Sequence, residues 1–142
     1  MKKTSLLLLS ALMLAGCATS PVSPSQAKPV PTDRIAYHGT GDSAITITRD
    51  TGYMMGGCYG VPTLDGKDIA RIDTGETVTI AVPHGDHLLG FKGDDQGRGL
   101  CSVSADSLFK EISVTLKPNE TKRFRISSLG DDPLGIHPTS IK

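Results

Sequence analysis

The 142-residue sequence contains no tryptophan and only three tyrosines and three phenylalanines. So few aromatic side chains predict a small core, and a chain of this length forms about one domain. Neither sign of charge dominates, because Lys plus Arg and Asp plus Glu both number 15. We therefore expect no nucleic-acid partner, since such a partner requires a strongly basic surface.

The sequence also lacks the local signatures of common catalytic and nucleotide-binding sites. It contains no Gly-x-Ser-x-Gly, no Walker loop, no Gly-x-Gly-x-x-Gly and no His-Glu-x-x-His. We therefore predict no catalytic residue, no metal and no cofactor.

A basic start followed by a short apolar run opens the chain. Lys2 and Lys3 precede an apolar stretch of about ten residues, which is too short to cross a bilayer as a helix. This pattern predicts a secretory signal peptide over residues 1–16.

The signal ends in Leu14-Ala15-Gly16-Cys17, which resembles the lipobox of bacterial, and specifically Gram-negative, lipoproteins. The resemblance implies that Cys17 becomes the first residue of the mature protein. It also implies that the Cys17 sulfur carries diacylglycerol, whose fatty-acyl chains, such as palmitate, hold the protein on a membrane. Ala18 stands where an Asp would favour retention in the inner membrane, which implies the periplasmic face of the outer membrane. The inner membrane is the alternative location, and an ordinary signal peptide with an unmodified Cys17 is the alternative interpretation of the motif.

Residues 17–34 are rich in proline and serine, with four Pro and three Ser. Such a segment cannot bury a core, and proline favours extended conformations. We expect the lipidated Cys17 to be followed by a disordered tether up to residue 34, with a reach of roughly 50 Å at about 3.1 Å per residue.

From residue 35 to residue 142 apolar and polar residues alternate with a period of two. Runs rich in β-branched residues lie at 45–48, 77–82, 112–116 and 123–126, with turn signals between them. This pattern predicts an all-β domain over 35–142, a small antiparallel β-sandwich of about seven to nine strands.

Two stretches of this domain are similar to a known kind of module. Val61-Pro62-Thr63-Leu64-Asp65-Gly66-Lys67 and Val82-Pro83-His84-Gly85-Asp86-His87 resemble the small extracytoplasmic β-sandwich domains of the PEGA type. The resemblance implies a sandwich and an envelope location, and no particular chemistry. In this pattern Asp65-Gly66 forms a tight hairpin that needs positive φ, and Gly85 forms a second turn.

Cys58 and Cys101 are the two cysteines that remain once Cys17 is lipidated. An even count in an oxidising compartment predicts a disulfide, worth about 3–4 kcal/mol in the chain-entropy estimate. Free or redox-active thiols are the alternative, although no Cys-x-x-Cys is present.

A few polar and apolar clusters could carry chemistry. His84 and His87, together with His38 or Asp94-Asp95, could contribute to a metal site, but their spacing alone is weak support. The glycine-dense residues 93–99 are expected to be a surface loop. Residues 53–60 are expected to be a core strand with a glycine bulge, or else an apolar contact surface.

These observations favour a membrane-anchored, non-enzymatic binding or scaffolding module of the envelope. The sequence names no partner, and peptidoglycan, an outer-membrane protein and another lipoprotein all stay open as candidates. The alternative is a small periplasmic enzyme or metal-binding protein that uses His84, His87 and Asp94-Asp95.

Overall fold

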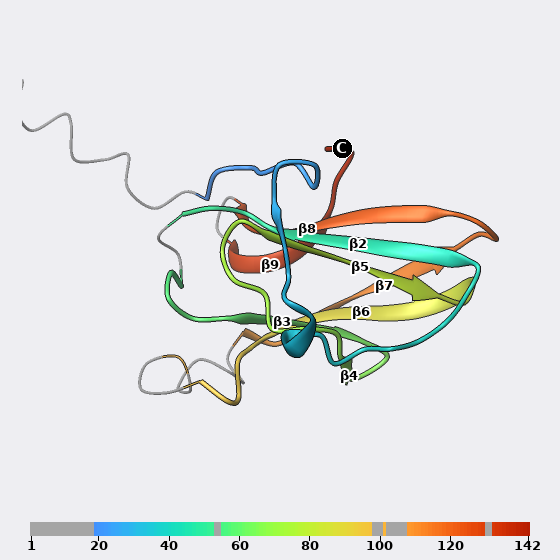
Figure 1. Cartoon of the computed structure of the whole chain (residues 1–142), viewed down its shortest axis with the longest axis horizontal. Coiled ribbons are helices and arrows are strands. Elements are labelled where there is room, and N and C mark those ends of the chain that lie inside the picture. The colour runs from blue at the N-terminus through green and yellow to red at the C-terminus, as the bar shows by residue number, and fades with distance from the viewer. Residues whose placement is uncertain (1–18, 53–54, 98–100, 102–107, 130–131) are drawn as a thin grey trace, which may run out of the picture.

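The computed structural model describes residues 19–52, 55–97, 101, 108–129 and 132–142. Nine strands in these ranges form two sheets that pack face to face, which confirms the predicted all-β sandwich (Figure 1). In the described part of the chain, no helix is long and apolar enough to cross a membrane.

The larger sheet is mixed rather than purely antiparallel. Two of its neighbouring pairs are parallel, β1 with β5 and β2 with β8. Parallel neighbours need a long connection, and the chain between β2 and β8 is long because it contains β5 and all four strands of the second sheet. In spatial order this sheet contains β1 (Lys28–Pro29), β5 (Glu76–Val82), β2 (Ser43–Arg49), β8 (Thr121–Leu129) and β9 (Asp132–Pro138).

The smaller sheet is antiparallel throughout. Among the described residues β7 has a sheet neighbour on one side alone, β6, and is therefore an edge strand. In spatial order the sheet contains β4 (Lys67–Asp68), β3 (Gly60–Leu64), β6 (Gly85–Gly93) and β7 (Lys110–Leu116).

Alternation along the strands places one set of side chains between the sheets. On β5, for example, Val78, Ile80 and Val82 are buried while Thr79 and Ala81 are exposed. Two of the three phenylalanines, Phe91 and Phe124, join this core, and β-branched residues fill most of the remainder. The small aromatic content is therefore compensated by residues that pack well on a pleated surface.

The turn between β3 and β4 has the predicted geometry. Asp65 and Gly66 have φ of 50° and 76°, as a tight hairpin with two left-handed central residues requires. Gly85, at the start of β6, has a φ of 131°, a value that side-chain-bearing residues rarely adopt.

The segment expected to be a free tether is attached to the sandwich over the part that the structure describes. Lys28–Pro29 form β1 against Glu76–Thr77 of β5, and the next residue, Val30, is buried in the core. The chain then forms a 3₁₀ helix, η2 (Thr32–Arg34).

The predicted boundary at residue 35 is therefore too late in the sequence. Proline does favour extended backbone here, but extended backbone can also complete a sheet. The amides of Lys28 and Val30 donate to the carbonyls of Gly75 and Thr77, so this segment covers the outer edge of β5.

Candidate functional site

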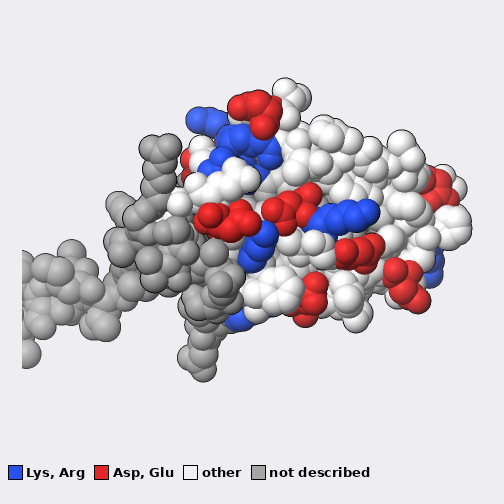
Figure 2. All heavy atoms as spheres, turned by 90° about the horizontal axis from the view of Figure 1, so that it is seen from below, with Lys and Arg blue, Asp and Glu red and all other residues white. Residues whose placement is uncertain are grey.

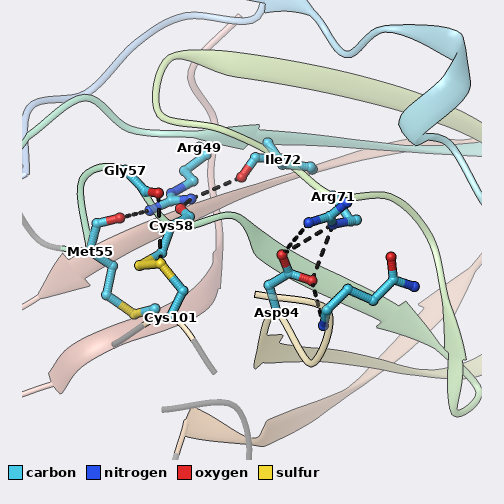
Figure 3. Close-up of a disulfide and its surroundings, with 9 residues drawn as sticks. Arg49, Met55, Gly57, Cys58, Arg71, Ile72, Asp94 and Cys101 are labelled. Carbon is cyan, nitrogen blue, oxygen red and sulfur yellow. Dashed lines mark hydrogen bonds and ion pairs between the residues drawn. A yellow bond between two sulfur atoms is a disulfide. The ribbon is translucent and has the colours of Figure 1, made fainter. Parts of the chain in front are cut away.

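The disulfide between Cys58 and Cys101 confirms the predicted pairing. Cys58 lies in the connection from β2 to β3, and Cys101 lies in the connection from β6 to β7, with Cα atoms 5.3 Å apart. The bond therefore joins two long connections at one end of the sandwich (Figure 3).

Arg49 lies directly beside this disulfide and is 1% exposed. Its guanidinium donates to the carbonyls of Cys58 at 2.6 Å, Ile72 at 2.9 Å and Met55 at 3.0 Å. Burial lowers the pKa of Arg49, while Asp73 and Glu76 act in the opposite direction. An arginine remains charged even so, and the carbonyl bonds compensate for the hydration that it loses.

The sequence contained a signal for this buried arginine that the periodicity analysis did not use. Ile45, Ile47 and Arg49 occupy alternate positions on β2, and the first two side chains point into the core. An arginine at an inward position of a strand requires internal acceptors. Here the Arg49 side chain attaches the connection between β2 and β3, which contains Cys58, to the body of the sandwich.

Two further arginines stack on Tyr59, next to the disulfide. The guanidinium carbons of Arg34 and Arg71 each lie 4.7 Å from the centre of the Tyr59 ring, within the range of cation–π attraction. Arg34 pairs with Glu76 at 2.5 Å, and Arg71 pairs with Asp94 at 2.6 Å. We call these five residues the Tyr59 cluster.

The Tyr59 cluster connects four separate parts of the chain. Arg34 belongs to η2, Tyr59 precedes β3, Arg71 and Glu76 lie in the stretch from the end of β4 to the first residue of β5, and Asp94 follows β6. Arg34 also donates to the carbonyl of Arg71 at 3.0 Å. Figure 2 shows acidic and basic side chains close together on one face of the molecule, without a large patch of one sign.

Two shallow hollows of about 200 and 270 Å³ flank Arg71, and Gln96 lines both of them. Each guanidinium in the cluster already has a carboxylate partner, so an anionic ligand would have to displace Asp94 or Glu76. We therefore interpret the cluster as a brace that holds these segments together.

The structure shows that residues 93–97 do more than form a surface loop. Asp94 is buried and its carboxylate accepts two hydrogen bonds from Nε of Arg71, each of 3.1 Å, and one from the amide of Gln96, also of 3.1 Å. Among residues 55–60, which the structure describes, Gly60 alone belongs to a strand, and residues 55–57 form a turn rather than the expected core strand. Tyr53, Met54 and the end of the glycine-dense loop lie outside the described residues.

Near the start of β6, the ring of His87 lies between two hydrogen-bond acceptors. Its Nδ1 lies 2.7 Å from Asp65 and its Nε2 lies 2.9 Å from the carbonyl of Pro83. Partial burial opposes the charged form, but the bonds to Asp65 and Pro83 raise the pKa of His87 overall. Both ring nitrogens face acceptors, so the doubly protonated ring satisfies this geometry.

His84 has a different partner, Asp42, at 2.9 Å. Asp94 and Asp95 follow the far end of β6, so roughly 20 Å of extended strand separates them from His87. Asp94 pairs with Arg71 and Asp95 lies 3.4 Å from Lys92, while His38 is exposed.

The residues considered for a metal or catalytic site are therefore distributed between opposite ends of the sandwich. Within the described ranges, no three His, Cys, Asp or Glu side chains gather as a metal site would require. Cys17 lies outside these ranges.

The open edge of the smaller sheet is the remaining feature that suggests binding. β7 has seven residues, and a groove of about 350 Å³ lies between it and β8 and β9 of the other sheet. Ile112, Val114, Phe124 and Pro138 contribute apolar surface to this groove, and Lys122 contributes a charge. An edge strand of this length presents backbone donors and acceptors to a partner.

Comparison of the chain with protein-family models, curated proteins and solved structures finds no match. The resemblance to PEGA-type domains therefore stays a prediction, and function has to be argued from the residues of this chain.

Proposed function

We propose that the chain is a lipid-anchored protein of the bacterial envelope, whose β-sandwich acts as a non-enzymatic binding or scaffolding module. The lipobox-like Leu14-Ala15-Gly16-Cys17, placed directly after the apolar run of a signal peptide, carries this proposal. Ala18 favours the outer membrane as its location. The bond between Cys58 and Cys101 supports a compartment in which disulfides persist.

The open edge of β7 supports the binding part of the proposal. An extended segment of another envelope protein can pair with such an edge, using main-chain hydrogen bonds for affinity and neighbouring grooves for specificity. The groove beside Ile112 and Phe124 supplies a place for apolar side chains of that segment. The alternative function would require His84, His87 and Asp94 in one concave site, and their side chains have separate partners.

Replacement of Cys17 tests the anchor. In cells fed with labelled palmitate we expect the wild-type chain to be labelled, and we expect Cys17→Ala to be unlabelled and to retain its signal peptide. Cys58→Ser is the matched control, because it removes a cysteine and leaves the lipobox intact. Labelling that survives Cys17→Ala would overturn the anchor.

The proposed location needs a separate experiment. Ala18→Asp should move the lipidated protein from outer-membrane to inner-membrane fractions of a density gradient. A wild-type protein already in the inner-membrane fraction would contradict the location while leaving the anchor intact.

Photo-crosslinking in cells tests the binding surface. A crosslinking residue at Ser113 on β7 should capture a specific envelope protein, whereas one at Ala81, exposed on β5 of the other sheet, should not. Equal capture at both positions would argue against β7 as the binding surface.

A further inference from the structure

The first described residues of the chain are bonded to one end of the sandwich. Ser20 and Thr51 form an antiparallel bridge, with amide-to-carbonyl distances of 2.7 and 3.1 Å. The hydroxyl of Thr19 accepts a hydrogen bond of 3.1 Å from the amide of Ser128. The chain therefore meets the domain where β2 and β8 end, on the left of Figure 1.

This attachment restricts where a lipid on Cys17 could lie. Two Cα–Cα steps separate Cys17 from Thr19, and a fully extended chain covers at most about 7 Å in that interval. A tether of residues 17–34 would have allowed the domain to stand roughly 50 Å from the membrane. The bonded segment instead places the anchor next to the end of the sandwich.

The same end carries exposed apolar side chains. Three large apolar side chains are exposed among the described residues: Leu88 at 47%, Phe109 at 52% and Leu129 at 48%. Leu129 follows Ser128, whose amide holds Thr19, and Phe109 directly precedes β7 at this end (Figure 1). Leu88 lies on β6, three residues after its start at the opposite end. We call this end of the sandwich, where Thr19, Phe109 and Leu129 lie, the anchored end.

We infer that the anchored end rests on the lipid bilayer, with Leu129 and Phe109 inserted at the boundary between headgroups and acyl chains. The inference deepens the proposed function and rests on it, because the acyl groups on Cys17 would hold the anchored end at the surface. Apolar side chains gain most when they leave water at such a boundary. The strands then run away from the membrane, and the open edge of β7 stays accessible to a partner.

Net charge indicates which force dominates this contact. Removal of residues 1–16 takes away Lys2 and Lys3 and no acidic residue, so 15 − 2 = 13 basic side chains remain against 15 acidic ones. A net charge near −2 gives no attraction to anionic lipids. The contact is therefore apolar, and added salt should leave it largely unchanged.

Because the chain contains no tryptophan, an introduced tryptophan is the sole source of indole fluorescence. Leu129→Trp and Leu88→Trp place one indole each at positions of nearly equal exposure, one at the anchored end and one away from it. The full-length lipidated variants are reconstituted into vesicles of phosphatidylethanolamine and phosphatidylglycerol, with and without brominated acyl chains. We expect bromine to quench the indole at position 129 several-fold more strongly than the indole at position 88, and Phe109→Trp to behave like Leu129→Trp.

Two controls keep the anchor and the orientation apart. Flotation of the vesicles measures the anchor, and quenching measures the orientation. Protein that floats with equal quenching at positions 129 and 88 overturns the inference and leaves the anchor in place, whereas protein that does not float overturns both. Circular dichroism and an intact Cys58–Cys101 bond show that each variant is folded.

A spacer tests whether the short connection sets the orientation. A ten-residue Gly/Ser insertion between Ala18 and Thr19 adds a span of roughly 17 Å. It should lower quenching at position 129 toward the level at position 88 without affecting flotation. Unchanged quenching in this variant would contradict the role assigned to the short connection.

Discussion

The two ends of the sandwich are held together in different ways. At the turn end, neighbouring residues close the hairpins, as Asp65-Gly66 does between β3 and β4. The anchored end also carries the disulfide, and we call it the disulfide end here. Its long connections are held together by the Cys58–Cys101 bond, the carbonyl bonds of Arg49 and the Tyr59 cluster. Local backbone conformation thus closes the hairpin at the turn end, whereas side-chain and covalent contacts hold the long connections at the disulfide end.

The largest effect should follow removal of the buried guanidinium at the disulfide end. Arg49→Met leaves the carbonyls of Cys58, Met55 and Ile72 without their donor. A buried acceptor left without its partner costs about 1–3 kcal/mol. With three carbonyls affected, we expect the free energy of unfolding in urea to fall by about 3–5 kcal/mol.

Lys117→Met is the matched control, because this exposed cation lies in the turn between β7 and β8. Its unfolding midpoint should stay close to that of the wild type. An Arg49→Met midpoint equally close to the wild type would show that the carbonyl bonds do not hold this end.

Loss of the Cys58–Cys101 disulfide, at the same end, should have the second-largest effect on stability. Cys58→Ser combined with Cys101→Ser removes the cross-link, and the free energy of unfolding should fall by roughly 2–4 kcal/mol. Either single variant should also form intermolecular dimers through the remaining thiol. Reduced wild-type protein should unfold like the double variant, and a midpoint insensitive to reduction would refute a stabilising role for the bond.

At the turn end, the backbone conformation of the Asp65-Gly66 turn should matter on its own. Gly66 has a φ of 76°, and a Cβ added there would meet no atom within 4 Å. Gly66→Ala should therefore destabilise through backbone strain alone, by about 1 kcal/mol. Lys67→Ala, directly after Gly66, should be neutral. Thermal unfolding with the same midpoint in both variants would argue against this explanation.

The smallest effect concerns the His87–Asp65 pair and depends on pH. The pKa of His87 is raised when the protein folds and that of Asp65 is lowered. The histidine therefore stabilises at acidic pH, and its contribution disappears as the pH rises through its folded-state pKa, above its ordinary value of about 6.5. The aspartate contributes above its ordinary value of about 3.9, and its contribution disappears as the pH falls below that.

His87→Gln should thus lower stability most near pH 5, where both groups are charged, and less at pH 9. Asp65 is half exposed, so we expect a difference below about 1 kcal/mol. Urea unfolding of both proteins at the two pH values measures it. A larger loss at pH 9 than at pH 5 would reverse the predicted sign.

Local features of the sequence were enough to predict the all-β class, the strands β2, β5, β7 and β8, the Asp65-Gly66 turn and the disulfide. Alternation with a period of two reports the environment of each side chain on a strand, and positive φ at a turn depends on the residues of that turn. The disulfide followed because only two cysteines remained to pair once Cys17 was assigned to the lipid.

Tertiary structure alone decided which distant groups meet. Arg71 and Asp94 are 23 positions apart, Arg34 and Glu76 are 42 apart, and Thr19 and Ser128 are 109 apart. Such pairs depend on the order of strands in the sheets, which a pattern within one strand does not encode. The proline-rich segment followed the same principle: its composition predicts extended backbone, but only the open side of β5 determines that this backbone joins the sheet.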